Sequence, residues 1–377
     1  MRHIALAVIA PITVVTLAAM VWLWPPGVGA PEQAGAAEQF NGEVTSVDRE
    51  QCSGTIEDDV NGCGNAQVRV ARGPEADREV ETPLPNGPGA PRIDEGDDVV
   101  LIVSDSPEGA MYSIVDHQRA IELWVLAAAF VLALVAFGRW RGFSALAGLA
   151  VTFALLLLFV VPAILAGESP LLVAIVGSAA IVLTVLYLTH GFALSTTVAV
   201  LGTLASLTIT GVLSAVSVAA LHLTGITDDI SASLGTSHSV NMEGLLLAGI
   251  VIGSLGVLDD VTVTQSATVT EVARANPEYG FGQLYRAGSR VGRSHIASVV
   301  NTIILAYAGS SLPLLILIVA NSDSLGGVVT DQIIAQEIVR SAVATLGLIA
   351  AVPITTALAA LTASGKIPSF DGGTDAS

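Results

Sequence analysis

Long apolar runs, separated by short polar connections, dominate the pattern of this chain. A helix needs about 20 apolar residues to cross the hydrocarbon core of a bilayer, which is about 30 Å thick. The runs therefore predict eight membrane-spanning helices, at residues 4–23, 119–137, 144–165, 170–189, 194–220, 242–265, 296–320 and 338–361.

A second pattern lies between the first two runs, where apolar and polar residues alternate in short segments bounded by Gly, Pro and Asn. Such alternation is typical of β-strands. Five strands within some eighty residues predict a small β-barrel or sandwich. We find no recognisable catalytic set here, and we expect this part to cap, to gate or to recruit a partner. The expected strands are 42–47, 66–70, 79–82, 99–103 and 112–115.

The two patterns together predict an α-helical multi-pass membrane protein of about eight transmembrane helices with a small extracytoplasmic β-domain. The first run could also be a signal peptide, but no small-x-small cleavage site follows Trp24, so we favour an uncleaved anchor. The expected parts are an anchor at 1–24, a Pro-, Gly- and Ala-rich linker at 25–39, the β-domain at 40–117, a seven-helix domain at 118–362 and a cytoplasmic tail at 363–377.

Charge is scarce and unevenly placed. Only 13% of the 377 residues are charged, and residues 31–117 hold nineteen acidic residues and five arginines, a balance of −14. This acidic block excludes a nucleic-acid partner, which requires a basic surface. It fits a solvated domain, or one that gathers cations near a membrane.

Basic residues between the runs indicate the orientation. Placing the arginine-rich loops in the cytoplasm satisfies the positive-inside rule, with both termini inside and residues 31–117 outside. The basic residues concerned are Arg139, Arg141, Arg274, Arg286, Arg290, Arg293 and Lys366.

The only two cysteines, Cys52 and Cys63, fall in the segment expected outside the membrane. An exported segment can keep a disulfide, so we expect these two residues to form one. A zinc site is the weaker alternative, because two cysteines without nearby histidines make a poor ligand set.

The best pointer to function is the pair Asp259 and Asp260, in the apolar stretch GIVIGSLGVLDDVTVTQSATV. A charged carboxylate within a bilayer costs about 2.5 to 3.5 kcal/mol on insertion scales. Such a pair is expected to bind a cation, to carry protons or to pair with a buried arginine. The structural alternative is an interfacial pair that caps a helix end or meets Arg290 and Arg293.

The surroundings of the pair suggest an irregular helix. Gly249 and Gly253 form a small-xxx-small motif, which favours helix contact or bending. Thr residues then alternate with other residues from Thr262 to Thr270, and β-branched residues lower helix propensity. We therefore expect the helix to break after Asp260, as in transporters that use unwound backbone for ion sites.

Neutral oxygen ligands could complete an ion or proton site. We assign this role to Thr262, Thr264, Gln265, Asn301 and Thr302.

Arg290 and Arg293 are the expected charge partners of the site, although they could instead contact anionic headgroups or bind an anionic substrate. The chain lacks a GxxxxGK[ST] phosphate loop, an HExxH motif and any cluster of Cys and His. We expect no enzyme activity and no cofactor, and the sequence alone does not indicate a metal site.

Several blocks of the chain resemble the YibE/F family of bacterial multi-pass membrane proteins. They are GSLGVLDDVTVTQSATVTEV at 253–272, ANP at 275–277, AGSRVGRSHIASVVNTIILAYAGSSLPLLIL at 287–317 and EIVRSAVATLGLIAAVPITTALAAL at 337–361. The resemblance covers roughly residues 120–362 and implies a plasma-membrane protein with an N-terminal extracytoplasmic region. The family motif maps onto Asp260, Thr262, Thr264, Gln265, Arg293, Asn301 and Thr302.

We expect a permease or exporter of unknown substrate, coupled to a cation or proton gradient. The alternative is a membrane scaffold or envelope partner whose β-domain binds another protein. The expected partners are the lipid bilayer and a cation or proton.

Overall fold

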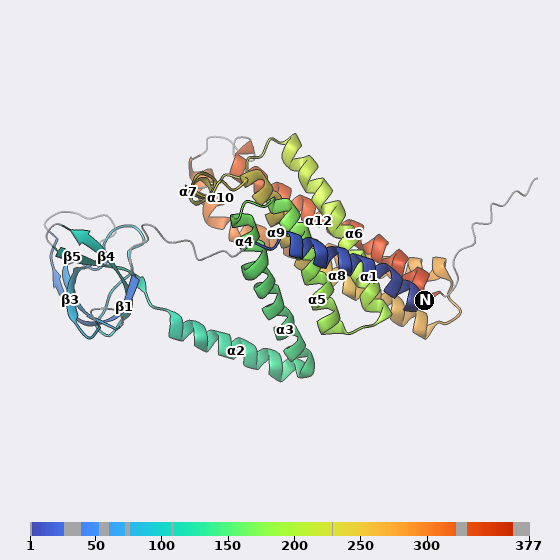
Figure 1. Ribbon diagram of the computed structural model, residues 1–377, viewed down its shortest axis with the longest axis horizontal. Helices are drawn as coiled ribbons and strands as arrows, with labels where there is room; N and C mark the ends of the chain where they lie inside the picture. Colours follow the sequence, from blue (N-terminus) through green and yellow to red (C-terminus); the bar gives the residue numbers. More distant parts are fainter. Residues whose placement is uncertain are drawn as a thin grey trace, which may run out of the picture. The chain divides into compact units, whose positions relative to one another are not determined.

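The computed structural model describes residues 2–25, 39–52, 60–71, 76–106, 109–227, 229–321 and 330–364. The chain divides into two compact units. We call Gly29–Arg139 the sheet unit, and Met1–Val28 with Trp140–Ser377 the helical unit. Figure 1 shows the elements of each.

The sheet unit contains five antiparallel strands in the order β3-β2-β1-β4-β5. The spatial sequence 4-1-2-3 within this order is a Greek key, and β5 extends it by a hairpin. All five segments predicted from the alternation are strands, each longer than expected. The strands are β1 (Gln39–Glu50), β2 (Cys63–Val70), β3 (Glu79–Pro83), β4 (Asp98–Ser106) and β5 (Gly109–His117).

Alternate side chains of these strands form one apolar core. Val44, Val68 and Leu101, each at most 1% exposed, lie on three different strands of this core. The two edge strands also approach each other, because the Thr82 hydroxyl on β3 donates a 3.0 Å hydrogen bond to the Tyr112 carbonyl on β5. The sheet is therefore curled like the small, partly open Greek-key barrels of OB-folds.

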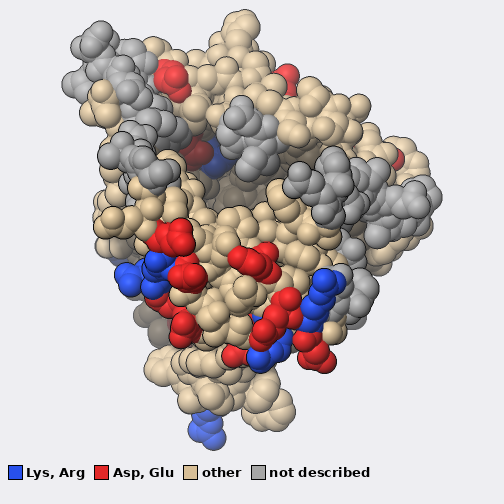
Figure 2. Space-filling model, turned by 90° about the vertical axis from the view of Figure 1, so that its left-hand side faces the viewer, with Lys and Arg blue, Asp and Glu red and all other residues tan. Residues whose placement is uncertain are grey.

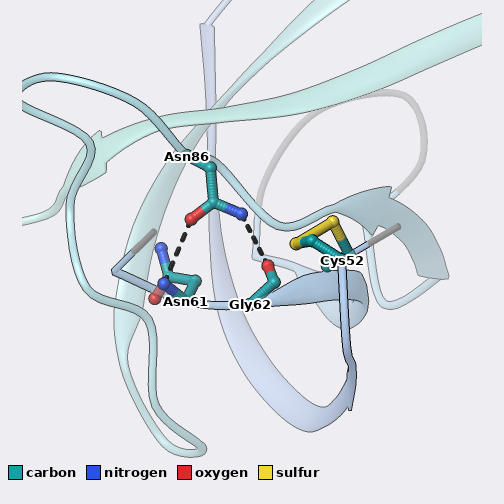
Figure 3. Close-up of a disulfide and its surroundings, with 5 residues drawn as sticks. Cys52, Asn61, Gly62 and Asn86 are labelled. Carbon is teal, nitrogen blue, oxygen red and sulfur yellow. Dashed lines mark hydrogen bonds between the residues drawn. A yellow bond between two sulfur atoms is a disulfide. The ribbon is translucent and has the colours of Figure 1, made fainter. Parts of the chain in front are cut away.

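A disulfide and a buried asparagine hold the loops at one end of the sheet unit (Figure 3). Cys52 and Cys63 are bonded, as predicted, with their Cα atoms 4.9 Å apart. Asn61, two residues before Cys63, donates to the carbonyls of Pro85 and Pro91 at 2.6 and 2.8 Å. Its side-chain oxygen accepts from the Ile93 amide at 2.8 Å. The short segment from Asn61 to Cys63 is thus linked to Cys52, to Pro85 and to the stretch from Pro91 to Ile93.

Charged side chains gather on the surface of the sheet unit, where acidic residues predominate and arginines lie among them (Figure 2). Arg49 contacts Asp94 at 2.8 Å, and Arg69 contacts Glu79 at 3.2 Å. These pairs are exposed, so each contributes little to stability. The surface is consistent with a solvated domain.

Six helices are long and apolar enough to cross a membrane, among the residues that the structure describes. The predicted count of eight is therefore not supported. The first predicted span lies on α1 (Arg2–Trp22), whose described apolar stretch, Ala7–Trp22, is shorter than the other six. The span predicted at 296–320 is divided at Ser311 between α9 (Phe281–Ser310) and α10 (Leu312–Asn321).

The six candidate spans include α2, the one that belongs to the sheet unit. A short helix, α7 (Asp229–Ser237), precedes the fifth of them. The six are α2 (Ala120–Gly138), α3 with its continuation (Trp140–Leu165), α5 (Pro170–His190), α6 (Leu194–Ala220), α8 (Met242–Ala275) and α12 (Gln332–Ala363).

The second span changes its helix type partway along. After α3 (Trp140–Leu155), residues Leu156–Val160 form one turn of π-helix, and α4 (Val161–Leu165) follows. Pro162 lies just beyond this turn and has no backbone N–H to continue the regular hydrogen-bond ladder. The wider turn accommodates this missing donor.

Helices α5, α6, α8 and α12 form the packed centre of the helical unit, with α9 against α8 and α12 (Figure 1). Glycines permit the closest approaches. A Cβ atom at Gly202 would overlap Thr355, and one at Gly347 would overlap Thr210. These contacts join α6 to α12, so small residues set how near the two backbones come.

The motif predicted to mediate helix contact does not lie at such an approach. A Cβ atom at Gly249 would meet no atom within 4 Å, and one at Gly253 would meet only the Tyr307 hydroxyl, at 3.3 Å. Gly249 and Gly253 have the spacing of a contact motif, but they face away from the packed centre of the helical unit.

Candidate functional site

Helix α8 carries the aspartate pair without interruption. It runs for 34 residues from Met242 to Ala275, so the predicted break after Asp260 is wrong. Two of the threonine hydroxyls that suggested a break are satisfied within the helix. Those of Thr268 and Thr270 each donate at 2.8 Å to a carbonyl one turn earlier, on Thr264 and Ser266.

The two aspartates differ sharply in their surroundings, because consecutive residues on a helix point about 100° apart. Asp259 is partly buried, and its Oδ1 atom is shielded from solvent without a hydrogen-bond partner among the described residues. Asp260 is exposed. A buried polar atom without a partner is costly and calls for an explanation. Asp259 is therefore the candidate centre of the site.

The packing of α8 against α6 gives the position of Asp259 relative to the end of α6. The Ser266 hydroxyl donates a 2.7 Å hydrogen bond to the carbonyl of Ser195, which lies just after the turn between α5 and α6. Asp259 is seven residues before Ser266, or about 10 Å along the helix at 1.5 Å per residue. Since the α5–α6 turn lies at one end of two candidate spans, Asp259 lies about 10 Å from that end along α8.

Thr262 lies one turn beyond Asp259, and its hydroxyl donates at 3.0 Å to the Asp259 backbone carbonyl. The same hydroxyl lies 2.6 Å from that of Thr203 on α6, and both residues are fully buried. Two hydroxyls thus meet between α6 and α8, close in sequence to the unpaired carboxylate oxygen.

Gln265 forms the next buried polar contact along α8. Its amide nitrogen donates to the Gly288 carbonyl on α9 at 2.8 Å and to the Thr356 hydroxyl on α12 at 2.7 Å. Gln265 is only 3% exposed. With its donors fully used, this side chain joins three helices.

The other predicted neutral ligands lie elsewhere. Thr264, Asn301 and Thr302 are exposed on the outside of the helical unit. The Thr302 hydroxyl donates at 3.2 Å to the carbonyl of Ser298 on its own helix. The structure therefore brings Thr262 and Gln265 into the packed centre, and does not bring these three residues to the same place.

Arg290 and Arg293 are exposed on α9, and no ion pair joins either to Asp259 or Asp260 in the described part of the chain. The Arg293 Nε atom donates at 3.4 Å to the carbonyl of Ser289. The predicted charge partners and the carboxylates are therefore separate features of the structure.

Several residues around the site had no role in the sequence prediction. Thr203 and Thr356 are buried hydroxyl partners from α6 and α12, and Gly288 and Gly292 let α9 approach Gln265. Their positions depend on which helix faces become neighbours, and a single sequence gives only a weak signal for that. The spaced small residues within 287–292 were the signal in the sequence for a close approach of α9.

A second feature is a cavity of about 530 Å³ between α9, α10 and α12. Its lining includes Tyr307, Glu337 and Thr345. Glu337 and Arg340 form an i, i+3 ion pair at 2.7 Å. Since this pair is internally neutral and the walls are mostly apolar, the cavity is a less direct candidate for a cation than Asp259.

The described residues contain no group of three or more His, Cys, Asp or Glu side chains that could hold a metal ion. The site can instead offer one carboxylate oxygen, with hydroxyl groups nearby. This chemistry suits a proton, which needs one acceptor, or a cation that keeps part of its water shell.

Comparison with known proteins identifies the family. The pattern of the YibE/F-like protein family matches residues 126–365. The chain belongs to the YibE/F-like family. No curated protein and no solved structure matches the chain. The matched region begins in α2 and ends just after α12, so it covers the aspartate pair and α5, α6, α9 and α12, which pack against α8.

Proposed function

We propose that this YibE/F-like protein is a permease or exporter that couples substrate movement to a proton or cation gradient. The observation that supports it is the partly buried Asp259, whose Oδ1 has no hydrogen-bond partner among the described residues. A carboxylate held in an apolar bundle without a partner is expensive, and binding a proton or cation relieves that cost.

The neighbouring residues give this carboxylate a fixed position. Gln265 joins α8 to α9 and α12, and the Thr203–Thr262 contact joins α8 to α6. Asp259 therefore lies on a helix held from several sides. A small change in the packing of these helices would alter the access of a proton or cation to the unpaired Oδ1 atom of Asp259. A coupled carrier requires such a change in access.

We further propose that the protein lies in a bacterial plasma membrane with both termini in the cytoplasm and the sheet unit outside. The arginines near α9 favour this orientation under the positive-inside rule. The Cys52–Cys63 disulfide is consistent with it, because disulfides persist in oxidising compartments.

The decisive experiment measures proton flux in proteoliposomes that contain the purified full-length chain and an internal pH dye. Gradients of Na⁺, K⁺ and Li⁺, and a membrane potential alone, are imposed in turn. We expect one of these conditions to drive proton movement in the wild type and Asp259→Asn to abolish it. Asp260→Asn is the matched control, since it makes the same chemical change at an exposed neighbouring position.

Two outcomes would contradict the proposal. One is equal flux in wild type and in Asp259→Asn. The other is no flux above that of empty liposomes under any of the conditions, which would remove proton coupling as stated.

The scaffold alternative is favoured by the division into two units, because a separate sheet unit with its own core can bind a partner protein. Deletion of residues 31–117 distinguishes the two functions. A cellular defect in the deletion strain, with none in Asp259→Asn, would favour the scaffold over the carrier.

A further inference from the structure

An arginine face on α9 is independent of the carboxylate site. Arg286, Arg290 and Arg293 lie at i, i+4 and i+7, so their side chains fall within about 60° of helix circumference. Together with Tyr279 and Gln283 they line an open pocket of about 360 Å³. Arg290 and Arg293 are exposed, as is Arg286.

These three arginines have no carboxylate partner in the described part of the helical unit. By contrast, Arg274 at the end of α8 is paired with Glu271, and Arg340 is paired with Glu337. The Nε atoms of Arg286 and Arg293 each bond to a carbonyl of α9 itself, at 3.1 and 3.4 Å. Their terminal nitrogens remain available, and guanidinium groups bind phosphate oxygens through two parallel hydrogen bonds.

The opposite face of α9 holds the helix in place. Cβ atoms at Gly288 would meet Val269 at 2.6 Å and Thr356 at 2.9 Å, and one at Gly292 would overlap Val352. Gln265 also bonds the Gly288 carbonyl. Because the glycine face is packed and the arginine face is open, the arginines are presented from a fixed helix.

The face also lies at the height of a lipid headgroup. The apolar part of α9 begins near Ile296, and Arg293 and Arg290 precede it by about 5 and 9 Å at 1.5 Å per residue. Headgroup layers are about 5 to 8 Å thick on each side of the hydrocarbon core. Arg293 therefore lies within this layer and Arg290 at its aqueous edge, whereas Arg286 lies about 15 Å from the core, on the aqueous side.

We propose that the arginine face of α9 is a binding site for a phosphate-bearing anion, either the headgroup of an anionic phospholipid or free phosphate. This site is separate from Asp259 and does not depend on the transport proposal.

The test is direct binding, by native mass spectrometry, to the full-length protein released from detergent. The probes are phosphatidylglycerol, phosphatidylcholine as the zwitterionic control, and inorganic phosphate. The test variant is Arg286→Gln/Arg290→Gln/Arg293→Gln. The matched control is Arg274→Gln/Arg139→Gln/Arg141→Gln, which removes the same charge at positions outside the pocket.

We expect phosphatidylglycerol to bind the wild type more tightly than phosphatidylcholine. Because a hydrogen bond to a charged group contributes about a tenfold factor or more, the test variant should bind at least about 100-fold more weakly. The control variant should keep wild-type affinity. Binding of inorganic phosphate that follows the same pattern, without a preference for phosphatidylglycerol, identifies a free anion as the ligand.

A conservative variant with three lysines guards against misfolding. It should fold as the wild type does and bind phosphatidylglycerol with intermediate affinity, because lysine keeps the charge but not the paired geometry. Equal loss in the test and control variants would overturn the proposal, since it would show a general charge effect. So would equal binding of every probe by the wild type and the test variant.

Discussion

The sheet unit and the helical unit treat their key buried polar side chains in opposite ways. In the sheet unit, Asn61 is 2% exposed and uses its amide oxygen and nitrogen in hydrogen bonds to three backbone groups. In the helical unit, Asp259 keeps one shielded oxygen without a partner among the described residues. A fully bonded polar group fixes a shape, whereas an unpaired one keeps its capacity to bind.

The two units also differ in what holds their segments together. The sheet unit uses a covalent link, Cys52–Cys63, beside the asparagine. The helical unit uses glycines such as Gly202 and Gly347, which let α6 and α12 touch. In the sheet unit the critical positions are therefore donors and acceptors, and in the helical unit they are residues without a side chain.

Replacing Asn61 should give the largest effect on stability. Asn61→Ala removes bonds to two carbonyls and leaves the buried Ile93 amide unpaired, which should cost about 3 kcal/mol at about 1 kcal/mol or more for each group. Hydrogen exchange of the sheet unit in the full-length protein measures this loss. Asn65→Ala is the control, since Asn65 donates to the exposed Glu81. Equal effects of the two substitutions would remove the distinction.

The glycine contacts come next. Gly347→Ala should lower stability by about 2 kcal/mol, because the added methyl group overlaps Thr210 in a packed interface. Gly249→Ala meets open space, so it should stabilise α8 by up to about 1 kcal/mol. Thermal unfolding of the detergent-purified protein compares the two. A loss of stability in both variants would contradict the placement of Gly249.

Replacing Asp259 with leucine should stabilise the helical unit by about 1 kcal/mol while abolishing flux, because it removes an uncompensated polar group from an apolar setting. Asp260→Leu should change stability by less than about 0.5 kcal/mol, as expected of an exposed position. The melting temperatures of both variants are measured side by side. A lower melting temperature for Asp259→Leu would indicate that the carboxylate has a stabilising partner.

The smallest effect concerns pH and the sheet unit. The hydrogen bond from Arg49, aided by the charges of Arg92 and Arg49, lowers the pKa of Asp94 below its ordinary value of 3.8. The stabilising contribution of this pair is therefore present above the unfolded-state pKa and is lost as the pH falls through the lowered one. Arg49→Gln should move the Asp94 titration midpoint upward, as followed by carboxyl NMR. An unchanged midpoint would exclude Arg49 as the cause.

Much of the fold could be predicted from the sequence, because strand alternation and apolar runs are local signals. All five strands lie where the alternation predicted them, and the disulfide joins the predicted cysteines. The predicted count of eight spans is not confirmed, since six of the described helices are long and apolar enough to cross a membrane. Apolarity alone does not reveal that the run at 296–320 is divided where α9 ends at Ser310, although Gly309 and Pro313 stand beside that break.

The candidate site was only partly predictable. The sequence indicated the aspartate pair, but not that Asp259 alone turns inward, since this depends on how α6 and α12 pack against α8. The same packing explains why the Gln265 side chain hydrogen-bonds to α9 and α12, whereas Thr264, the preceding residue, is exposed. Residue type and spacing limited the choices, and tertiary contacts decided among them.

Helix α2 has a consequence for how the protein responds to its membrane. None of its 19 residues, all of which are described, is buried. At 1.5 Å per residue it is about 29 Å long, close to the thickness of an average hydrocarbon core. With no spare length, it would stand nearly upright in such a bilayer, and a thinner one would force it to lean. Lipid composition, through the thickness of the bilayer, would then set the tilt of this helix.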